Sequence, residues 1–199
     1  TLEALPVGAR VGTSSLRRKS QLAAVRPDLT ILDLRGNVDT RLRKLDEGQY
    51  EAIILAGAGL NCLGLQGRIT AELDPTLMLP AIGQGALGIE LRRDGTQLLA
   101  DLQFLHDPRT ATAVAAERAF LLRLEGGCQV PIGAHAVVDG ETVRLTGLIA
   151  SVDGRQLIRD TLTAPPADAT ALGTRLAELL LARGGKAILD AVYNATPDE

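Results

Sequence analysis

The 199-residue sequence contains few aromatic residues, with two Phe, two Tyr and no Trp. Because single-stranded nucleic acids are commonly bound by stacking their bases on aromatic side chains, this scarcity argues against a nucleic-acid partner. No apolar run approaches the length of a membrane-spanning helix and no secretory signal opens the chain, so we expect no membrane partner either. The hydrophobic content of 46% is nevertheless ordinary for a globular protein with a proper core.

Cysteine and histidine are also scarce. The two cysteines, Cys62 and Cys128, lie far apart in the sequence and predict no disulfide framework, which favours a reducing, cytoplasmic setting. The two histidines, His106 and His135, have no metal-ligand spacing between them. We therefore expect structural roles for both histidines and no metal site.

Positive charge is concentrated at one end of the chain. Residues 1–45 contain nine Lys or Arg and four Asp or Glu, a net charge of +5, whereas the whole chain carries −3. A basic segment on an otherwise acidic chain indicates an anionic ligand.

The first 85 residues repeat one pattern three times: an apolar strand, a turn of small or polar residues, and a helix. The first expected strand ends near residue 13, and the next two cover residues 30–34 and 52–56. The helices are expected to begin at Ser14 or Ser15, at Asn37 and at Gly57. This alternation predicts a parallel α/β sheet.

Ligands bind outside the carboxyl ends of the strands in such sheets, and several polar and basic residues are expected there. Arg17 and Arg18 occupy the first turn of a predicted helix, where cations oppose the helix dipole and a bound anion would reverse the penalty. The alternative is a solvated basic turn without a ligand. The residues expected at this edge are Thr13, Ser15, Arg17, Arg18, Arg35 and the backbone amides of residues 57–59, and Arg41 is expected one helical turn into the helix that follows Arg35.

The middle of the chain changes character. Residues 79–85 are rich in Gly and Pro and predict either a plain loop or a hinge formed by Gly83, Gln84 and Gly85. Residues 86–91 then read as a strand.

The last part of the chain predicts a small α+β domain. Asp107 and Pro108 mark the start of a helix that reaches about residue 124, with Ala111 and Leu122 among its inward residues. Three strands at residues 132–138, 142–150 and 155–163 follow, with turns at Asp-Gly pairs, and then two helices. We expect a three-stranded antiparallel sheet with helices on one face.

Cys128 lies between the predicted helix and the first of these strands, after two glycines and before Pro131. One interpretation is that the thiol merely fills a gap, as free cysteines often do. The position after a helix C-terminus disfavours a thiolate, so a functional role would be that of a covalent anchor.

Four motifs in the right order resemble the hydroxymethylbilane synthase family, also called porphobilinogen deaminases, over essentially the whole chain. The motifs are residues 11–18 (VGTSSLRR), 34–42 (LRGNVDTRL), 79–86 (LPAIGQGA) and 124–133 (LEGGCQVPIG).

The resemblance implies an enzyme that joins four porphobilinogen units into hydroxymethylbilane with release of ammonia. Its growing oligopyrrole starts from a dipyrromethane cofactor held by a thioether, here to Cys128. Because each pyrrole carries an acetate and a propionate, arginines bind the chain. The matching positions are Thr13, Ser14, Ser15, Arg17, Arg18, Arg35 and Arg41, with backbone contacts at Gly36, Ala56 and Gly57 and a hinge at Gly83, Gln84 and Gly85.

The resemblance also implies a division into domains. Residues 1–85 resemble the second family domain, which is like half of a periplasmic-binding-protein fold, and residues 86–105 resemble a return segment of the first domain. Residues 106–199 resemble the cofactor-bearing third domain. The family is expected to be monomeric when full length.

Two departures from the family pattern limit what the chain can do. The aspartate that assists deamination lies upstream of Thr1, so we expect a fragment without a catalytic residue of its own and without activity alone. Cys62 stands where the family usually has Arg. The alternative hypothesis is a non-enzymatic anion-binding module of the periplasmic-binding-protein type, which would need the arginines but not Cys128.

Overall fold

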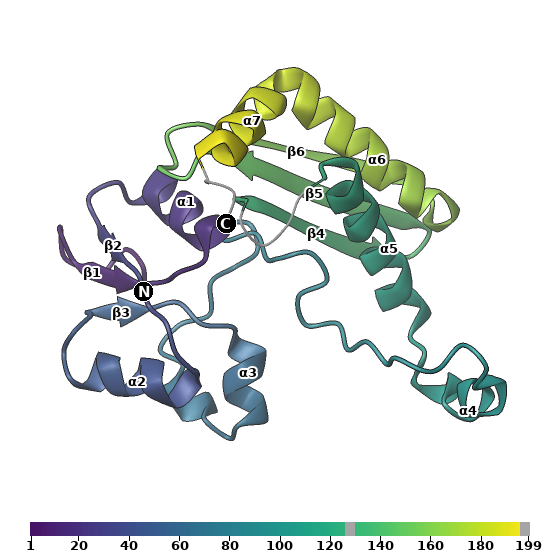
Figure 1. Ribbon diagram of the computed structural model, residues 1–199, viewed down its shortest axis with the longest axis horizontal. Coiled ribbons are helices and arrows are strands. Elements are labelled where there is room, and N and C mark those ends of the chain that lie inside the picture. Colours follow the sequence, from purple (N-terminus) through teal and green to yellow (C-terminus); the bar gives the residue numbers. More distant parts are fainter. Residues whose placement is uncertain (126–129, 196–199) are drawn as a thin grey trace.

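A computed structural model describes residues 1–125 and 130–195 and contains two sheets that differ in type (Figure 1). The first sheet is parallel with strand order β2-β1-β3, and the second is antiparallel with order β4-β5-β6. The prediction of a parallel sheet followed by a three-stranded antiparallel sheet is therefore confirmed.

The strands and helices alternate in the first part and are grouped in the second. The strands are β1 (Arg10–Gly12), β2 (Thr30–Leu32), β3 (Ala52–Ile53), β4 (Ile132–Asp139), β5 (Thr142–Ala150) and β6 (Leu157–Ala164). The α-helices are α1 (Leu16–Val25), α2 (Val38–Asp46), α3 (Gly57–Cys62), α4 (Thr96–Asp101), α5 (Pro108–Arg123), α6 (Ala169–Leu180) and α7 (Lys186–Ala195), and short helical turns occur at Gln66–Arg68, Gln103–Leu105, Pro166–Asp168 and Leu181–Gly185.

The parallel sheet is small because its strands are only two or three residues long. Val11 pairs with Ile31 on one side and with Ala52 on the other, so β1 is the central strand. Polar side chains begin the helices as predicted: Ser15 accepts a hydrogen bond from the Arg18 amide, and Asn37 accepts one from the Thr40 amide. The helices therefore start directly beyond the carboxyl ends of the strands.

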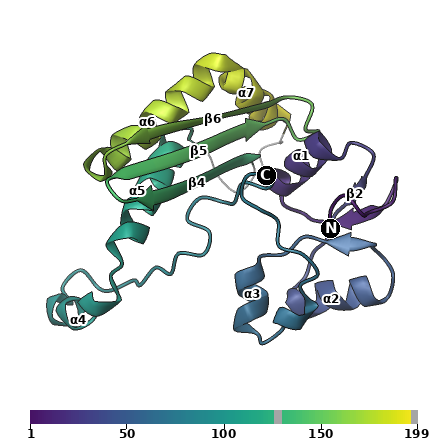
Figure 2. The same cartoon turned by 180° about the vertical axis from the view of Figure 1, so that it is seen from behind.

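The antiparallel sheet carries the larger core. Helices α5, α6 and α7 lie on one face of it (Figures 1 and 2). Phe120 and Leu176 are fully buried between this face and the helices. A Cβ atom on Gly173 of α6 would lie 2.2 Å from the carbonyl oxygen of Ala116 in α5, so the close approach of these two helices requires glycine there.

Helix α1 lies between the two sheets in both views (Figures 1 and 2). The turn between β5 and β6 packs directly on it, since a Cβ on Gly154 would lie 2.4 Å from the carbonyl oxygen of Ser20. Arg159 of β6 also donates to the carbonyl oxygens of Thr76 and Pro75. The two parts of the molecule thus meet along α1 and the segment before residue 79.

The predicted strand at residues 86–91 is wrong. These residues adopt no regular structure, and Leu87 and Ile89 are 98% and 55% exposed. An alternating apolar pattern forms a strand only where a neighbouring edge offers backbone hydrogen bonds, and none of the described strands pairs with this segment. The following helix, α4, lies apart from both sheets (Figure 1).

The inward face expected for α5 also needs correction. Ala111 and Leu122 are exposed, Leu122 to 80%, whereas Ala116, Glu117 and Phe120 are buried. The position of α6 and of the sheet decides which side of α5 faces inward. The buried face of α5 includes the carboxylate of Glu117, which a pattern of apolar residues at helical spacing does not predict.

No helix within residues 1–125 and 130–195 is both long and apolar enough to cross a membrane. The same residues contain no cluster of three or more His, Cys, Asp or Glu side chains suited to a metal ion.

Candidate anion-binding site

Hydroxyl groups hold the carboxyl ends of β1 and β2 together. The Ser14 hydroxyl donates to the Leu34 carbonyl oxygen at 2.9 Å and accepts from the Leu34 amide at 3.0 Å. Thr13 is buried, and its hydroxyl accepts from the Ser15 amide at 3.3 Å. These contacts fix the turn from which α1 and its two arginines begin.

Arg17 is a buried cation that has no carboxylate partner among the residues that the structure describes. Its side chain is bound by neutral acceptors, the carbonyl oxygen of Leu79 and the side-chain oxygen of Gln84, the latter at 3.2 Å. Burial, with a smaller contribution from neighbouring Arg18, lowers the pKa of Arg17 to about 10. A carboxylate ligand would relieve this cost, because it would supply the missing negative charge.

Arg18 is half-buried and has a similar environment. It donates to the carbonyl oxygen of Ile54 at 2.8 Å, just beyond the end of β3. Its pKa is lowered by burial and then by the positive charge of Arg41. The helix after β2 therefore adds a third positive charge to the field at Arg18.

Arg35, Gly36 and Arg41 surround the start of α2. Gly36 has φ of 122°, and its carbonyl oxygen accepts from Arg41 Nε at 2.7 Å. The Arg35 side chain is exposed, while its carbonyl oxygen accepts from Lys44. The left-handed backbone at Gly36 thus turns the chain so that Arg41 folds back toward the end of β2.

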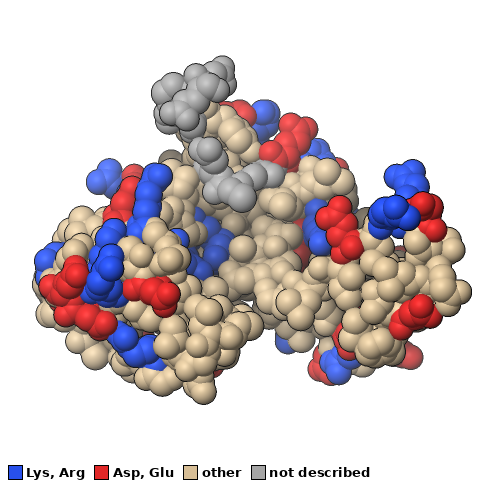
Figure 3. Space-filling view, turned by 60° about the horizontal axis from the view of Figure 1, so that its bottom comes forward, with Lys and Arg blue, Asp and Glu red and all other residues tan. Residues whose placement is uncertain are grey.

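A cavity of about 560 Å³ is lined by some of these residues and not by others. Arg17, Arg18, Gly57 and Gln84 contribute to its lining, together with residues of β3. Arg35, Gly36, Arg41 and Ala56 do not line it. Figure 3 shows Lys and Arg atoms in the hollow between the parallel-sheet part at the left and the rest of the molecule.

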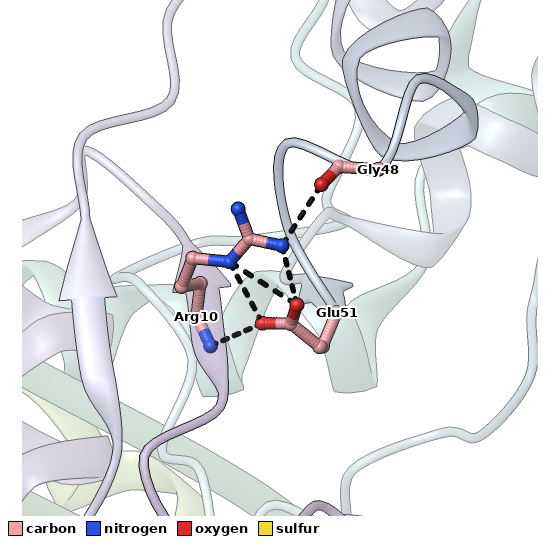
Figure 4. Close-up of polar contacts among 3 residues, drawn as sticks. All are labelled: Arg10, Gly48 and Glu51. Carbon is pink, nitrogen blue, oxygen red and sulfur yellow. Dashed lines mark hydrogen bonds and ion pairs between the residues drawn. The ribbon is translucent and has the colours of Figure 1, made fainter.

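The candidate arginines make no ion pair within residues 1–125 and 130–195. Nine ion pairs of Lys or Arg occur in these residues, and none of them includes Arg17, Arg18, Arg35 or Arg41. Arg10, at the other end of β1, is bound to Glu51 through several hydrogen bonds (Figure 4). Other basic residues, such as Arg109 and Arg159, also donate to carbonyl oxygens and make no ion pair in this part of the chain, so burial is what distinguishes Arg17.

The predicted hinge is held from both sides. Gln84 contacts Arg17, and the amide of Gly83, whose φ is 66°, donates to Glu117 at 2.6 Å. Gly85 also has a positive φ of 89° and is exposed. Glu117 was missed by sequence reasoning, although a carboxylate between apolar residues of a core helix is a usable signal.

The structure describes one of the two cysteines. Cys62 is exposed at the end of α3. Cys128, the predicted cofactor anchor, lies outside the described residues, which resume at Val130.

Comparisons with known proteins give two family matches that together cover most of the chain. Residues 1–100 match the family described as porphobilinogen deaminase, dipyromethane cofactor binding domain. Residues 111–182 match the family described as porphobilinogen deaminase, C-terminal domain.

Curated relatives agree with these matches. A porphobilinogen deaminase of Trichlorobacter lovleyi is 56% identical over 193 residues, which are 97% of this chain and 62% of the relative. Those of Roseiflexus castenholzii and Syntrophobacter fumaroxidans are each 55% identical, over 95% and 96% of this chain and 62% of their own lengths. The chain thus spans about three fifths of the length of these relatives.

Proposed function

The chain belongs to the porphobilinogen deaminase family, and we propose that it is the part of a hydroxymethylbilane synthase that binds the dipyrromethane cofactor and the growing oligopyrrole. The complete protein joins four porphobilinogen units with release of ammonia. The observation that carries this proposal is the group of arginines at one edge of the parallel sheet that, in the described part of the chain, have no carboxylate partners.

The residues at this edge fit a ligand that carries several carboxylates. Arg17 and Arg18 present guanidinium groups that are partly desolvated and bound only to neutral oxygens. Guanidinium groups pair with carboxylates through two parallel hydrogen bonds, each charge-assisted bond contributing about 1.5–3 kcal/mol. Arg35 and Arg41 extend the positive field along α2, so that successive acetate and propionate groups would find a cation.

Each site residue has a distinct task in this proposal. Arg17 and Arg18 bind carboxylates, Thr13 and Ser15 hold the start of α1, and Ser14 fixes the strand ends beside them. Gly36, Ala56 and Gly57 offer backbone groups at the starts of α2 and α3. Cys128 is the attachment point, and the dipyrromethane, when bound, supplies the primer from which chain growth starts.

The domain boundaries belong to the same proposal. Residues 1–85 form a domain like half of a periplasmic-binding-protein fold, residues 86–105 belong with a further domain, and residues 106–199 form the cofactor-bearing domain. The apolar side chains of Leu87 and Phe104 are 98% and 79% exposed, so they bury little surface against the described residues, which supports the assignment of the middle segment to a further domain. Without that further domain the 199-residue chain is inactive.

Cytoplasmic location and a monomeric state complete the proposal, and light scattering of the complete protein tests the latter. A dimer in solution would contradict it.

The mass of the complete protein, made in cells, tests the main proposal. We expect an increment of two pyrrole units on Cys128 and its absence in Cys128→Ser, with loss of turnover. Active protein with an unmodified Cys128 would refute the proposal. The alternative, an anion-binding module, predicts that Cys128→Ser retains full ligand affinity and that no variant or wild-type protein releases ammonia from porphobilinogen.

A further inference from the structure

Glu117 is a buried carboxylate that joins three elements of the structure. The side chain extends from α5 and is 6% exposed. One carboxylate oxygen accepts from the Gly83 amide at 2.6 Å, and the other accepts from the Ala136 amide of β4 at 2.8 Å. Glu117 therefore connects the segment after residue 79 to both the helix and the sheet of the C-terminal part.

The far side of the same segment supplies the acceptors for Arg17. Gln84 follows Gly83 directly, and its side-chain oxygen accepts from Arg17 Nη2 at 3.2 Å. The Leu79 carbonyl oxygen accepts from Arg17 Nη1, and the Leu79 amide donates to Gln21 at 2.7 Å. Residues 79–84 are thus bound to α1 at one side and to Glu117 at the other.

Two hydrogen bonds and the peptide bond between Gly83 and Gln84 connect Glu117 to Arg17 in the anion site. Gly83 has φ of 66°, a conformation that a backbone tie must hold in place, because glycine itself has little preference for it. The Gly83 amide bond to Glu117 is such a tie, beside the backbone bonds of the turn itself, and it helps to set the place from which Gln84 reaches Arg17. Loss of this bond would remove the connection between residues 83–84 and α5 and loosen the position of Gln84 relative to Arg17.

We propose that Glu117 is a positioning residue for the anion site, which holds Arg17 in its binding geometry through Gly83 and Gln84. The identity of the ligand rests on the proposed function, whereas the coupling between Glu117 and Arg17 does not. Glu117 makes no contact with the candidate arginines among the hydrogen bonds and ion pairs of the described residues, so it acts through the segment between them.

The charge on Glu117 matters for this role. Burial raises the pKa of Glu117, while the two amide donors and nearby His135, whose Nδ1 lies 3.8 Å away, favour the ionised form. A carboxylate accepts both amide bonds, whereas an amide side chain presents a donor to one of them. Glu117→Gln therefore preserves the shape of the side chain and breaks one tie.

Hydrogen exchange in the complete protein tests the coupling without reference to function. In Glu117→Gln we expect the Gly83 amide to exchange about tenfold faster, because a charge-assisted bond is lost, while β5 amides stay protected. Arg17→Leu should also accelerate exchange at Gly83, because coupling between two sites is reciprocal. Wild-type exchange at Gly83 in either variant would overturn the proposal. Glu178→Gln, which removes a surface ion pair with Arg123, is the control and should leave Gly83 unchanged.

Kinetics then show whether the coupling reaches the ligand. We expect Glu117→Gln to raise the KM for porphobilinogen about tenfold with little change in kcat, and to have no further effect in an Arg17→Lys background. Independent, multiplicative effects of the two substitutions would overturn the proposal, since a purely structural role predicts them. Absence of turnover in the wild-type protein would instead refute the proposed function, and the exchange data would still decide the coupling.

A second variant covers the case in which Glu117→Gln does not fold. Gln84 is exposed, so Gln84→Met should leave the core intact while it removes the bond to Arg17. It should raise the KM by a similar factor and show the same lack of additivity with Arg17→Lys. An unchanged KM would contradict the path from Glu117 to Arg17.

Discussion

The arginines at the two ends of strand β1, Arg10 and Arg17, differ in their exposure and in the charge of their partners. At the amino end, Arg10 is 44% exposed and bound to Glu51 by a charged pair, with a further hydrogen bond to the Gly48 carbonyl oxygen (Figure 4). Beyond the carboxyl end, Arg17 is 7% exposed, and its hydrogen-bond acceptors within residues 1–125 and 130–195 are all neutral. Arg17, the more buried of the two arginines, is therefore the one without a carboxylate partner among the described residues.

This difference separates a structural role from a binding role. A surface ion pair stabilises a protein little, but each of its two charges is neutralised by the other. A buried cation without a carboxylate costs stability, and perturbed pKa values of this kind cluster at functional sites. We therefore propose that the carboxyl edge of the parallel sheet binds an anion, whereas Arg10 at the amino edge already has Glu51 as its partner.

The largest expected effect follows from removal of the buried cation. In the complete protein, Arg17→Leu should lower kcat/KM by about 10- to 150-fold, the equivalent of one charged hydrogen bond of about 1.5–3 kcal/mol. Arg10→Leu, the matched substitution at the other end of β1, should change it less than about twofold. Steady-state release of ammonia from porphobilinogen measures both, and equal losses in the two variants would erase the contrast.

Geometry as well as charge should matter at Arg18. Arg18→Lys retains the positive charge but cannot form two parallel bonds to one carboxylate, so we expect the KM to rise about tenfold. Arg10→Lys should leave the KM unchanged. A KM for Arg18→Lys equal to that of the wild-type protein would show that Arg18 acts only as a point charge.

Ligand binding should stabilise the protein most while the unpaired cation is present. In the complete protein with Cys128→Ser, porphobilinogen at about 100 times its Kd should add about 2.7 kcal/mol, which calorimetry reads as a rise in Tm of several degrees. The rise should persist with Arg10→Leu, whereas with Arg17→Leu it should fall to about half or less at the same concentration of porphobilinogen. A rise of wild-type size without Arg17 would place the ligand elsewhere.

The smallest expected effect is on acid stability. The Arg10 side chain, through its hydrogen bonds, lowers the pKa of Glu51 from 4.5 to about 2. Because this pKa is lower in the folded than in the unfolded protein, the pair stabilises the fold above about pH 4.5, and the contribution is lost as the pH falls toward 2.

Glu51→Gln should therefore reduce the slope of stability against pH within this interval and leave it unchanged near neutrality. Acid unfolding followed by circular dichroism measures the slope, and Glu47→Gln, which changes a surface pair with Arg43 and an exposed hydrogen bond from Gln49, is the control. An identical slope in Glu51→Gln and wild type would show that Glu51 contributes nothing to acid sensitivity.

Sequence reasoning succeeded where the cause is local. Helix starts at Ser14 or Ser15, at Asn37 and at Asp107 were predicted from the ability of such side chains to accept a backbone amide, and Ser15, Asn37 and Asp107 each accept the amide three residues on. It failed at residues 86–91, because a strand also depends on a partner edge elsewhere in the protein. It placed Ser14 among the hydroxyls at the strand ends without predicting that this hydroxyl joins β1 to β2.

The sequence by itself determined where helices begin, the order of strands and turns, the basic character of the first 45 residues, and the family to which the chain belongs. Tertiary structure alone decided which of those arginines would be buried without a counter-charge. The partners of Arg17 lie 62 and 67 residues away along the chain, and those of Glu117 come from a linker and a strand. Caps and turns follow from neighbours within a few residues, whereas desolvation and its cost depend on every group that packs around a charge.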